Sequence, residues 1–166
     1  MGSAMGSFAL IQPYFKLLMA TNPNSIPALE TETDNLGVIC FMYLFFASNA
    51  SIKGYAYMIK VVVIDGTHLR GRYGGCLVAA STQDANFQCF PLVFGIVNSE
   101  NDEAWTWFMN KLSDFVPDDP DLIFVSDRHT SIYASIRKVH INAIPNLLVS
   151  NFYNKGKYIV SPNMIY

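Results

Sequence analysis

The sequence has few charged residues, and the two signs nearly balance. Only 14% of the 166 residues are Asp, Glu, Lys or Arg, with 13 acidic and 11 basic side chains and a formal net charge of −2. Proteins that bind nucleic acid through a broad surface are usually strongly basic, so this composition excludes that mode of binding. Any contact with nucleic acid must therefore come from a local basic patch.

Cysteines and long apolar runs are also scarce. The cysteines are three in number and lack a Cys-x-x-Cys pair, which excludes a disulfide framework and predicts small buried side chains in a reducing compartment. From their spacing we expect no zinc cluster that combines Cys40, Cys76 and Cys89 with His68, His129 and His140. The apolar run at 36–47 is too short to cross a bilayer, so no membrane association is expected.

The apolar fraction is large, at 51%, in a chain long enough for one domain with its own core. Val61-Val62-Val63-Ile64 predicts a strand that is buried on both faces and ends at Asp65. The stretch 122–126 repeats the pattern and ends at Asp127. Two such strands side by side would bring two carboxylates to one sheet edge, a common way to bind a divalent metal. The alternative is that each aspartate caps the following turn or helix.

Before residue 61 the patterns are weaker. A helical pattern covers 1–20, and extended segments cover 26–33 and 38–46, with a helix as the alternative continuation of the second. The glycine-rich stretch 66–75 contains two arginines and is expected to be a mobile basic loop. A hairpin follows, with strands at 76–82 and 88–97, in which Pro91 favours an edge or a bulge.

The second half of the chain alternates helices with strands. Ser99 and Asp102 fit a capping box before a helix. One face of that helix is apolar and consists of Trp105, Phe108, Leu112 and Phe115. A strand at 122–126 and a helix at 130–140 follow, and a short helix is expected near 147–157. The order from residue 61 is strand, strand, strand, helix, strand, helix, which predicts an α/β fold.

Several motifs occur together and in order within 60–140. They are Asp65-Gly66-Thr67-His68-Leu69, Arg72-Tyr73-Gly74-Gly75, Asp84-Ala85-Asn86, Phe90-Pro91-Leu92-Val93-Phe94-Gly95-Ile96-Val97, Glu100-Asn101, Trp105-Thr106-Trp107-Phe108 and Ser126-Asp127-Arg128-His129. In this order they resemble the plant Mutator-like element (MULE) transposase domain. The element order resembles the ribonuclease-H-like fold, a mixed sheet whose first three strands are antiparallel and whose flanking helices cover it. The resemblance divides the chain into an N-terminal segment (1–59), the core (60–140) and a divergent tail (141–166).

The resemblance implies a DDE-type transposase, which cleaves DNA and transfers the strand in the nucleus. Asp65 and Asp127 would be its first two catalytic acids and would bind Mg²⁺ or Mn²⁺. The implied partners are transposon-end DNA and other transposase subunits. Arg70, Arg72, Arg128 and His129 lie beside these acids in the sequence and are the candidates for phosphate contacts. The alternatives are solvated loop charges for the two loop arginines and a plain helix-start position for the other two residues.

Two departures from the family pattern weaken the expectation of activity. The family's third acid, a glutamate, and its Cys-x-x-His step are expected beyond the second aspartate, and neither is found. The resemblance therefore implies a core truncated at its C-terminus and inactive alone, with Glu100, Asp102 and Glu103 as alternative third ligands or ordinary helix-start acids. A transposase-derived transcription regulator of the far-red-response type and an inert transposon remnant are the other hypotheses.

Overall fold

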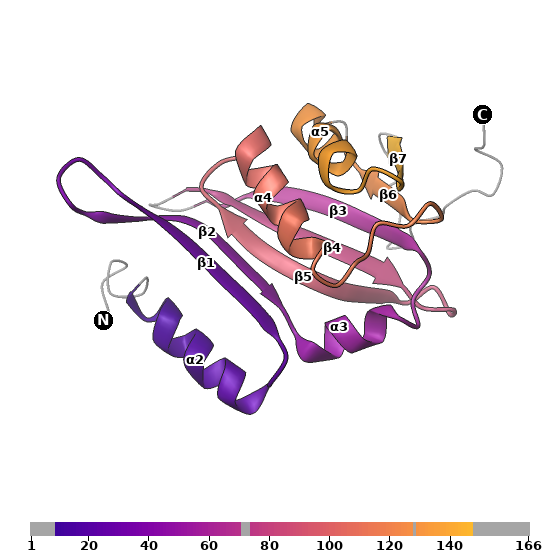
Figure 1. Ribbon diagram of the computed structural model, residues 1–166, viewed down its shortest axis with the longest axis horizontal. Helices are drawn as coiled ribbons and strands as arrows, with labels where there is room; N and C mark the ends of the chain where they lie inside the picture. The colour runs from indigo at the N-terminus through magenta and orange to yellow at the C-terminus, as the bar shows by residue number, and fades with distance from the viewer. Residues whose placement is uncertain (1–8, 71–73, 128, 148–166) are drawn as a thin grey trace.

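The computed structural model describes residues 9–70, 74–127 and 129–147, and its elements form a mixed sheet with flanking helices (Figure 1). Within these residues seven strands form one sheet, in the order β1-β2-β5-β4-β3-β6-β7. The strands are β1 (Ile26–Thr33), β2 (Ile39–Ala47), β3 (Val61–His68), β4 (Cys76–Gln83), β5 (Cys89–Val97), β6 (Ile123–Ser126) and β7 (Ile144–Leu147). The helices are α2 (Ile11–Thr21), α3 (Asn49–Tyr55), α4 (Asp102–Leu112) and α5 (Thr130–Val139).

The strand directions confirm the α/β class. Strands β3, β4 and β5 are antiparallel neighbours, whereas β6 and β7 join the other side of β3 in parallel. Parallel neighbours need a crossover connection, and α4 and α5 supply it. The arrangement is compatible with a ribonuclease-H-like fold.

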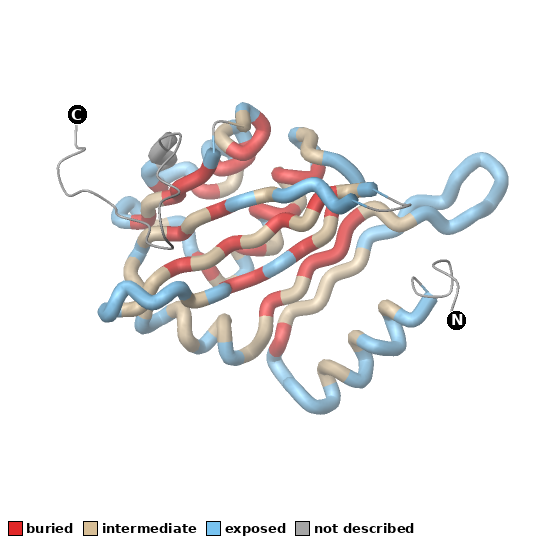
Figure 2. Tube along the Cα trace, turned by 180° about the vertical axis from the view of Figure 1, so that it is seen from behind, coloured by how far each residue is buried: buried red, intermediate tan, exposed pale blue. Residues whose placement is uncertain are grey.

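One face of the sheet carries the main core. Figure 1 shows α4 and α5 in front of the strands. On this face β4 contributes alternate buried residues, beginning with Cys76 and Val78, and α4 buries Trp105 and Phe108 against them. Figure 2 shows the strands from behind, where none of the described helices lies over the middle of the sheet. Side chains alternate between the faces of a strand, so burial alternates along β3 and β4 as well.

The segment before β3 adds two strands to the same sheet. β1 and β2 form an antiparallel hairpin, and β2 pairs with β5. Helix α2 contacts this hairpin where Phe15 stacks on Phe46, with ring centroids 6.2 Å apart. No helix in the described part of the chain is long and apolar enough to cross a membrane.

Several sequence predictions need correction. β3 does not end at Asp65 but continues to His68, because backbone pairing with β4 extends through that residue. The strand is also not buried on both faces: Val62 and Ile64 are buried, but Val61 and Val63 only partly, because no described helix covers their face. Residues 66–68 are therefore strand rather than the start of a loop.

Two further corrections concern helices. Helix α3 was expected only as an alternative continuation of β2, and in the structure it begins after the separate cap Ser48, whose side chain accepts a hydrogen bond from the Ser51 backbone. Helix α4 is capped by Asn101 rather than Ser99, because the Asn101 side chain accepts from the backbone of Ala104 at 2.8 Å.

Pro91 lies where a register shift separates Ala80 from Ser81, as expected for a bulge. The helix expected near 147–157 lies almost wholly outside the described residues.

Candidate functional site

The strand register brings together the two aspartates that the sequence analysis selected. In the parallel pair of β3 and β6, Ile64 lies beside Ser126. Asp65 and Asp127 are the next residues in the two segments, so they follow neighbouring positions about 5 Å apart, the usual spacing between strands. The two aspartates are 62 positions apart in the sequence (127 − 65), and the parallel pairing of β3 with β6 brings their segments to within one strand spacing.

Both aspartates are exposed, and each makes one local hydrogen bond. Asp65 Oδ1 accepts from the Gly66 backbone at 2.9 Å, and Asp127 Oδ1 accepts from the His129 backbone at 3.2 Å. The Asp127 bond is the turn-type bond of the capping alternative, whereas the Asp65 bond is to the next residue within β3. A carboxylate has several lone pairs, so one such bond leaves capacity for a cation. The local bonds and a metal role are therefore compatible.

Glu100 lies between the two segments that carry these aspartates. Its Oε2 is 3.9 Å from His129 Nε2, and its Oε1 accepts a hydrogen bond from Cys76 Sγ at 2.9 Å. The carboxylate also lies so close to Gly66 that a methyl group there would collide with it. Of the three acids considered as alternative third ligands, Asp102 and Glu103 instead occupy the exposed first turn of α4.

Cys76 is buried and is held as a thiol. Burial, together with the hydrogen bond to Glu100 and its negative charge, raises the pKa of Cys76 to about 12. A thiol with this pKa donates a hydrogen bond to the neighbouring carboxylate and is a poor nucleophile near neutral pH. The arrangement therefore gives no support to cysteine-based nucleophilic catalysis.

The same cysteine belongs to a cluster that the sequence analysis missed. His68, Cys76 and Glu100 each offer one ligand atom, and these atoms all lie within 4.8 Å of one another. The expectation of no zinc cluster from the cysteines and histidines stays a prediction, but it did not anticipate that His68 and Cys76 lie together. The cause was the register: His68 pairs with Cys76 across β3 and β4, and treating 66–75 as one loop concealed that pairing. The sequence signal is the pair Gly74-Gly75 just before β4, and both glycines have a positive φ, of 61° and 90°.

The candidate DNA-contacting residues are only partly described. Arg70 is exposed just beyond β3, whereas Arg72 and Arg128 lie outside the described residues. His129 is the N-cap residue of α5 and makes no side-chain capping bond, and its Nε2 faces Glu100. The structure thus leaves the proposed phosphate contacts as predictions.

Three other residues of the motifs quoted above have structural roles. Trp105 is 1% exposed in the core, and Trp107 packs against it while its Nε1 donates to Glu30 at 2.7 Å. Asp84 holds the β4–β5 turn, because its Oδ1 accepts from the backbones of Asn86 and Gln88. None of these side chains is needed to explain a binding site.

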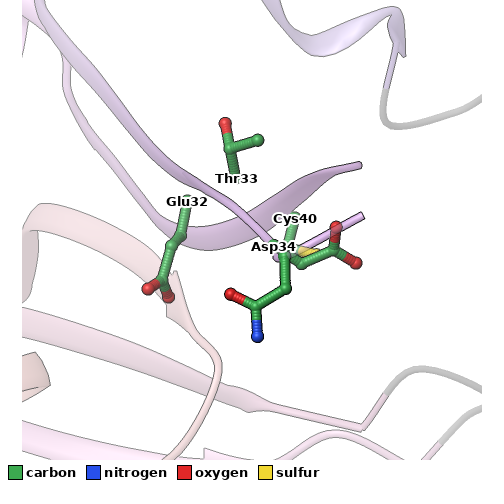
Figure 3. Close-up of a pocket in the computed structure, with 5 residues that line it drawn as sticks. Glu32, Thr33, Asp34 and Cys40 are labelled. Carbon is green, nitrogen blue, oxygen red and sulfur yellow. The ribbon is translucent and has the colours of Figure 1, made fainter. Parts of the chain in front are cut away.

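A pocket of about 270 Å³ lies at the tip of the β1–β2 hairpin (Figure 3). It is lined by five residues of that hairpin, namely Glu32, Thr33, Asp34, Asn35 and Cys40. In the close-up the side chains of Glu32 and Thr33 extend to opposite sides of their strand. All of the lining residues belong to the tip of one hairpin, so this pocket is separate from the aspartate pair and gives no support to a binding site there.

Comparison with known proteins matches the part of the chain that carries these residues. The family model of the MULE transposase domain matches residues 61–155, more than half of the chain. The match begins at the first residue of β3 and includes both aspartates, Glu100 and His129. No curated protein matches the chain.

Proposed function

Since the chain belongs to the MULE transposase domain family, we propose that it forms the ribonuclease-H-like catalytic core of a DDE-type DNA transposase of plant origin. In this proposal Asp65 and Asp127 bind Mg²⁺ or Mn²⁺, and the substrate is the phosphodiester backbone of transposon-end DNA. A protein that acts on chromosomal DNA in a plant cell works in the nucleus. Its expected protein partners are further transposase subunits.

The observation that supports this proposal is the parallel register of β3 and β6. Ile64 pairs with Ser126, so the two exposed aspartates follow adjacent positions of neighbouring strands. Carboxylate oxygens are hard donors, which suit Mg²⁺ and Mn²⁺. The residues therefore fit the cation that the family implies.

The acidic and the basic side chains would have different roles. Asp65 and Asp127 would hold the cation and through it orient the scissile phosphate, because their own negative charges would repel a phosphate that approached them directly. A bound Mg²⁺ or Mn²⁺ would activate the attacking oxygen and stabilise the leaving one. Arg70, Arg72 and Arg128 would hold flanking phosphates, to which a guanidinium can donate two parallel hydrogen bonds. His129 would lie next to the same phosphates.

Metal binding is tested by titrating Mn²⁺ into the protein and recording the heat. We expect weak binding, because the proposed site has two carboxylates and each further one would add Coulomb attraction. The substitutions Asp65→Asn and Asp127→Asn should each abolish the heat, whereas Asp114→Asn, a change of an exposed acid just after α4, should leave it intact. Equal heats in all four proteins would remove the metal site and the proposed catalysis with it.

DNA binding is tested by measuring the affinity for duplex DNA at several salt concentrations. Phosphate contacts release counterions, so affinity should fall steeply with salt. Arg70→Gln should reduce the slope of log K against log salt by about 1, the share of one phosphate contact. Nicking of supercoiled DNA with Mn²⁺ then separates the hypotheses. Nicking that is lost in Asp127→Asn would show an active core. Its absence fits a core that is inactive alone as well as both alternatives, and DNA binding then separates a regulator from an inert remnant.

A further inference from the structure

We propose that His68, Cys76 and Glu100 form a site for Zn²⁺ or a similar transition metal, separate from the carboxylate pair. The three residues come from the end of β3, the start of β4 and the segment between β5 and α4. Such a metal would connect the β3–β4 hairpin to the start of α4. This inference goes beyond the proposed transposase function and does not depend on it.

The geometry needs little change to accept a metal. The three ligand atoms lie within 4.8 Å of one another, and Cys76 Sγ is 2.9 Å from Glu100 Oε1. Tetrahedral Zn²⁺ has bonds of about 2.3 Å to sulfur and 2.1 Å to nitrogen or oxygen, which separates neighbouring ligand atoms by roughly 3.5 Å. The thiol and the carboxylate would therefore move apart by only about half an ångström, as the metal replaced the proton they now share.

The donor set selects the metal. A thiolate is a soft ligand and an imidazole is intermediate, so their combination favours Zn²⁺ over the hard ions Mg²⁺ and Mn²⁺. Three protein ligands leave a fourth position for water, as in zinc sites that keep one coordination position open. Cys76 is fully buried whereas His68 is exposed, so the metal can enter from the His68 side.

The surroundings hold two of the ligands in place. His68 and Cys76 are paired across the β3–β4 ladder, which fixes the distance between their backbones. Glu100 is 17% exposed, and its second oxygen faces His129 Nε2 at 3.9 Å. A second partner of this kind orients a metal-bound carboxylate. The cluster thus combines a buried cysteine and a largely buried glutamate with one exposed histidine at the end of β3.

The cluster and the aspartate pair use different faces of β3. Gly66 lies against Glu100 and Trp105 on the face covered by α4. Side chains alternate along a strand, so His68 shares that face, whereas Asp65 is on the opposite one. The two sites can therefore bind different metals at the same time.

The test is a Zn²⁺ titration of the whole chain against a coloured chelator. It uses a Cys40→Ser/Cys89→Ser background, because these two exposed thiols would also bind zinc. We expect one Zn²⁺ per chain. His68→Gln, Cys76→Ser and Glu100→Gln should each weaken binding by more than about 100-fold, the upper end of what losing even an outer-shell partner costs. Co²⁺ should give a thiolate-to-metal absorption band that disappears in Cys76→Ser.

The controls keep the result unambiguous. Cys76 is buried and its replacement could unfold the chain, so circular dichroism checks the fold of each variant. His68→Gln changes an exposed position and tests the zinc site even if Cys76→Ser does not fold. Asp65→Asn should leave zinc affinity unchanged while it removes Mn²⁺ binding. The proposal is overturned if His68→Gln binds zinc as tightly as the parent, if Co²⁺ shows no thiolate band, or if Asp65→Asn abolishes zinc binding. Failure of the Mn²⁺ titration would overturn only the transposase chemistry.

Discussion

Two neighbouring rows of residues cross the sheet and differ completely in their surroundings. The row on the face under α4 consists of Gly66, Val78, Gly95 and Phe45, which are paired in this order across β3, β4, β5 and β2. The next row, on the opposite face, consists of Asp65, Ala79, Phe94 and Phe46. Val78 and Phe45 are fully buried, whereas Phe94 is 48% exposed. A shift of one residue thus separates the core from an open surface.

The covered row shows how closely a helix can approach a sheet. Two of its four positions are glycine, and α4 places Trp105 near Gly66 and Phe108 near Gly95. Phe108 also meets Phe45 edge to face, at 5.6 Å between ring centroids. The small positions on the strands therefore make room for large aromatic side chains on the helix. Among the described residues, α2 meets only the Phe46 end of the open row, through Phe15. No described helix covers Asp65 and Phe94 at the rest of the row, and it is there that an exposed carboxylate is tolerated.

The largest expected effect is the loss of an aromatic ring from the covered side. Phe108→Ala should lower the free energy of unfolding by about 3–5 kcal/mol, since it leaves a cavity between α4 and the sheet. Phe94→Ala removes the same ring from the open row and should cost well under half as much, because the ring is already half in water. Urea unfolding followed by circular dichroism measures both. Similar losses would contradict the assignment of the core to one face.

A smaller effect is expected from filling the space beside Glu100. Gly66→Ala adds a methyl group that displaces the Glu100 carboxylate, the end of a flexible side chain, so it should cost no more than about 1 kcal/mol, the low end of what overpacking costs. Thr67→Ala changes the adjacent exposed position and is the matched control. Adding Glu100→Ala to Gly66→Ala should recover much of the loss in a double-mutant cycle. If the two changes in the free energy of unfolding simply add, the residue at position 66 and the Glu100 carboxylate do not meet.

The smallest effect is a dependence of stability on pH. Burial lowers the pKa of His140 below its usual 6.5, against the opposing hydrogen bond to the Val116 carbonyl and the charge of Asp118. The folded state thus keeps this histidine neutral, and the unfolded state binds the proton more readily. Stability should be fully present above pH 6.5 and fall as the pH drops through 6.5 towards the lower folded pKa.

The test of this pH dependence compares the free energy of unfolding at pH 8 and pH 5. His140→Gln, which retains a donor for the Val116 carbonyl, should flatten the dependence. His68→Gln removes an exposed histidine and should leave it as in the parent. A slope that persists in His140→Gln would assign the effect to other groups.

Much of the element order followed from local patterns. The β4–β5 hairpin, α4 and α5 were predicted close to their observed bounds, because their hydrophobic periods of two or 3.6 residues depend only on neighbours in the chain. The N-cap of α4 was misassigned because Ser99 and Asn101 are both good caps, and only the backbone path selects between them. β7 was missed because a short four-residue strand in a weakly patterned tail is defined by its partner β6 rather than by its own residues.

For the site, the sequence by itself determined which residues carry chemistry: two aspartates after apolar runs, three histidines, and motifs of the MULE transposase domain. The tertiary structure alone decided which of them meet. It placed Asp65 next to Asp127 through the parallel pairing of β3 with β6, and it joined His68, Cys76 and Glu100 on the other face. The physical reason is that register and facing are set by backbone pairing between distant segments, where a slip of one residue reverses every side chain.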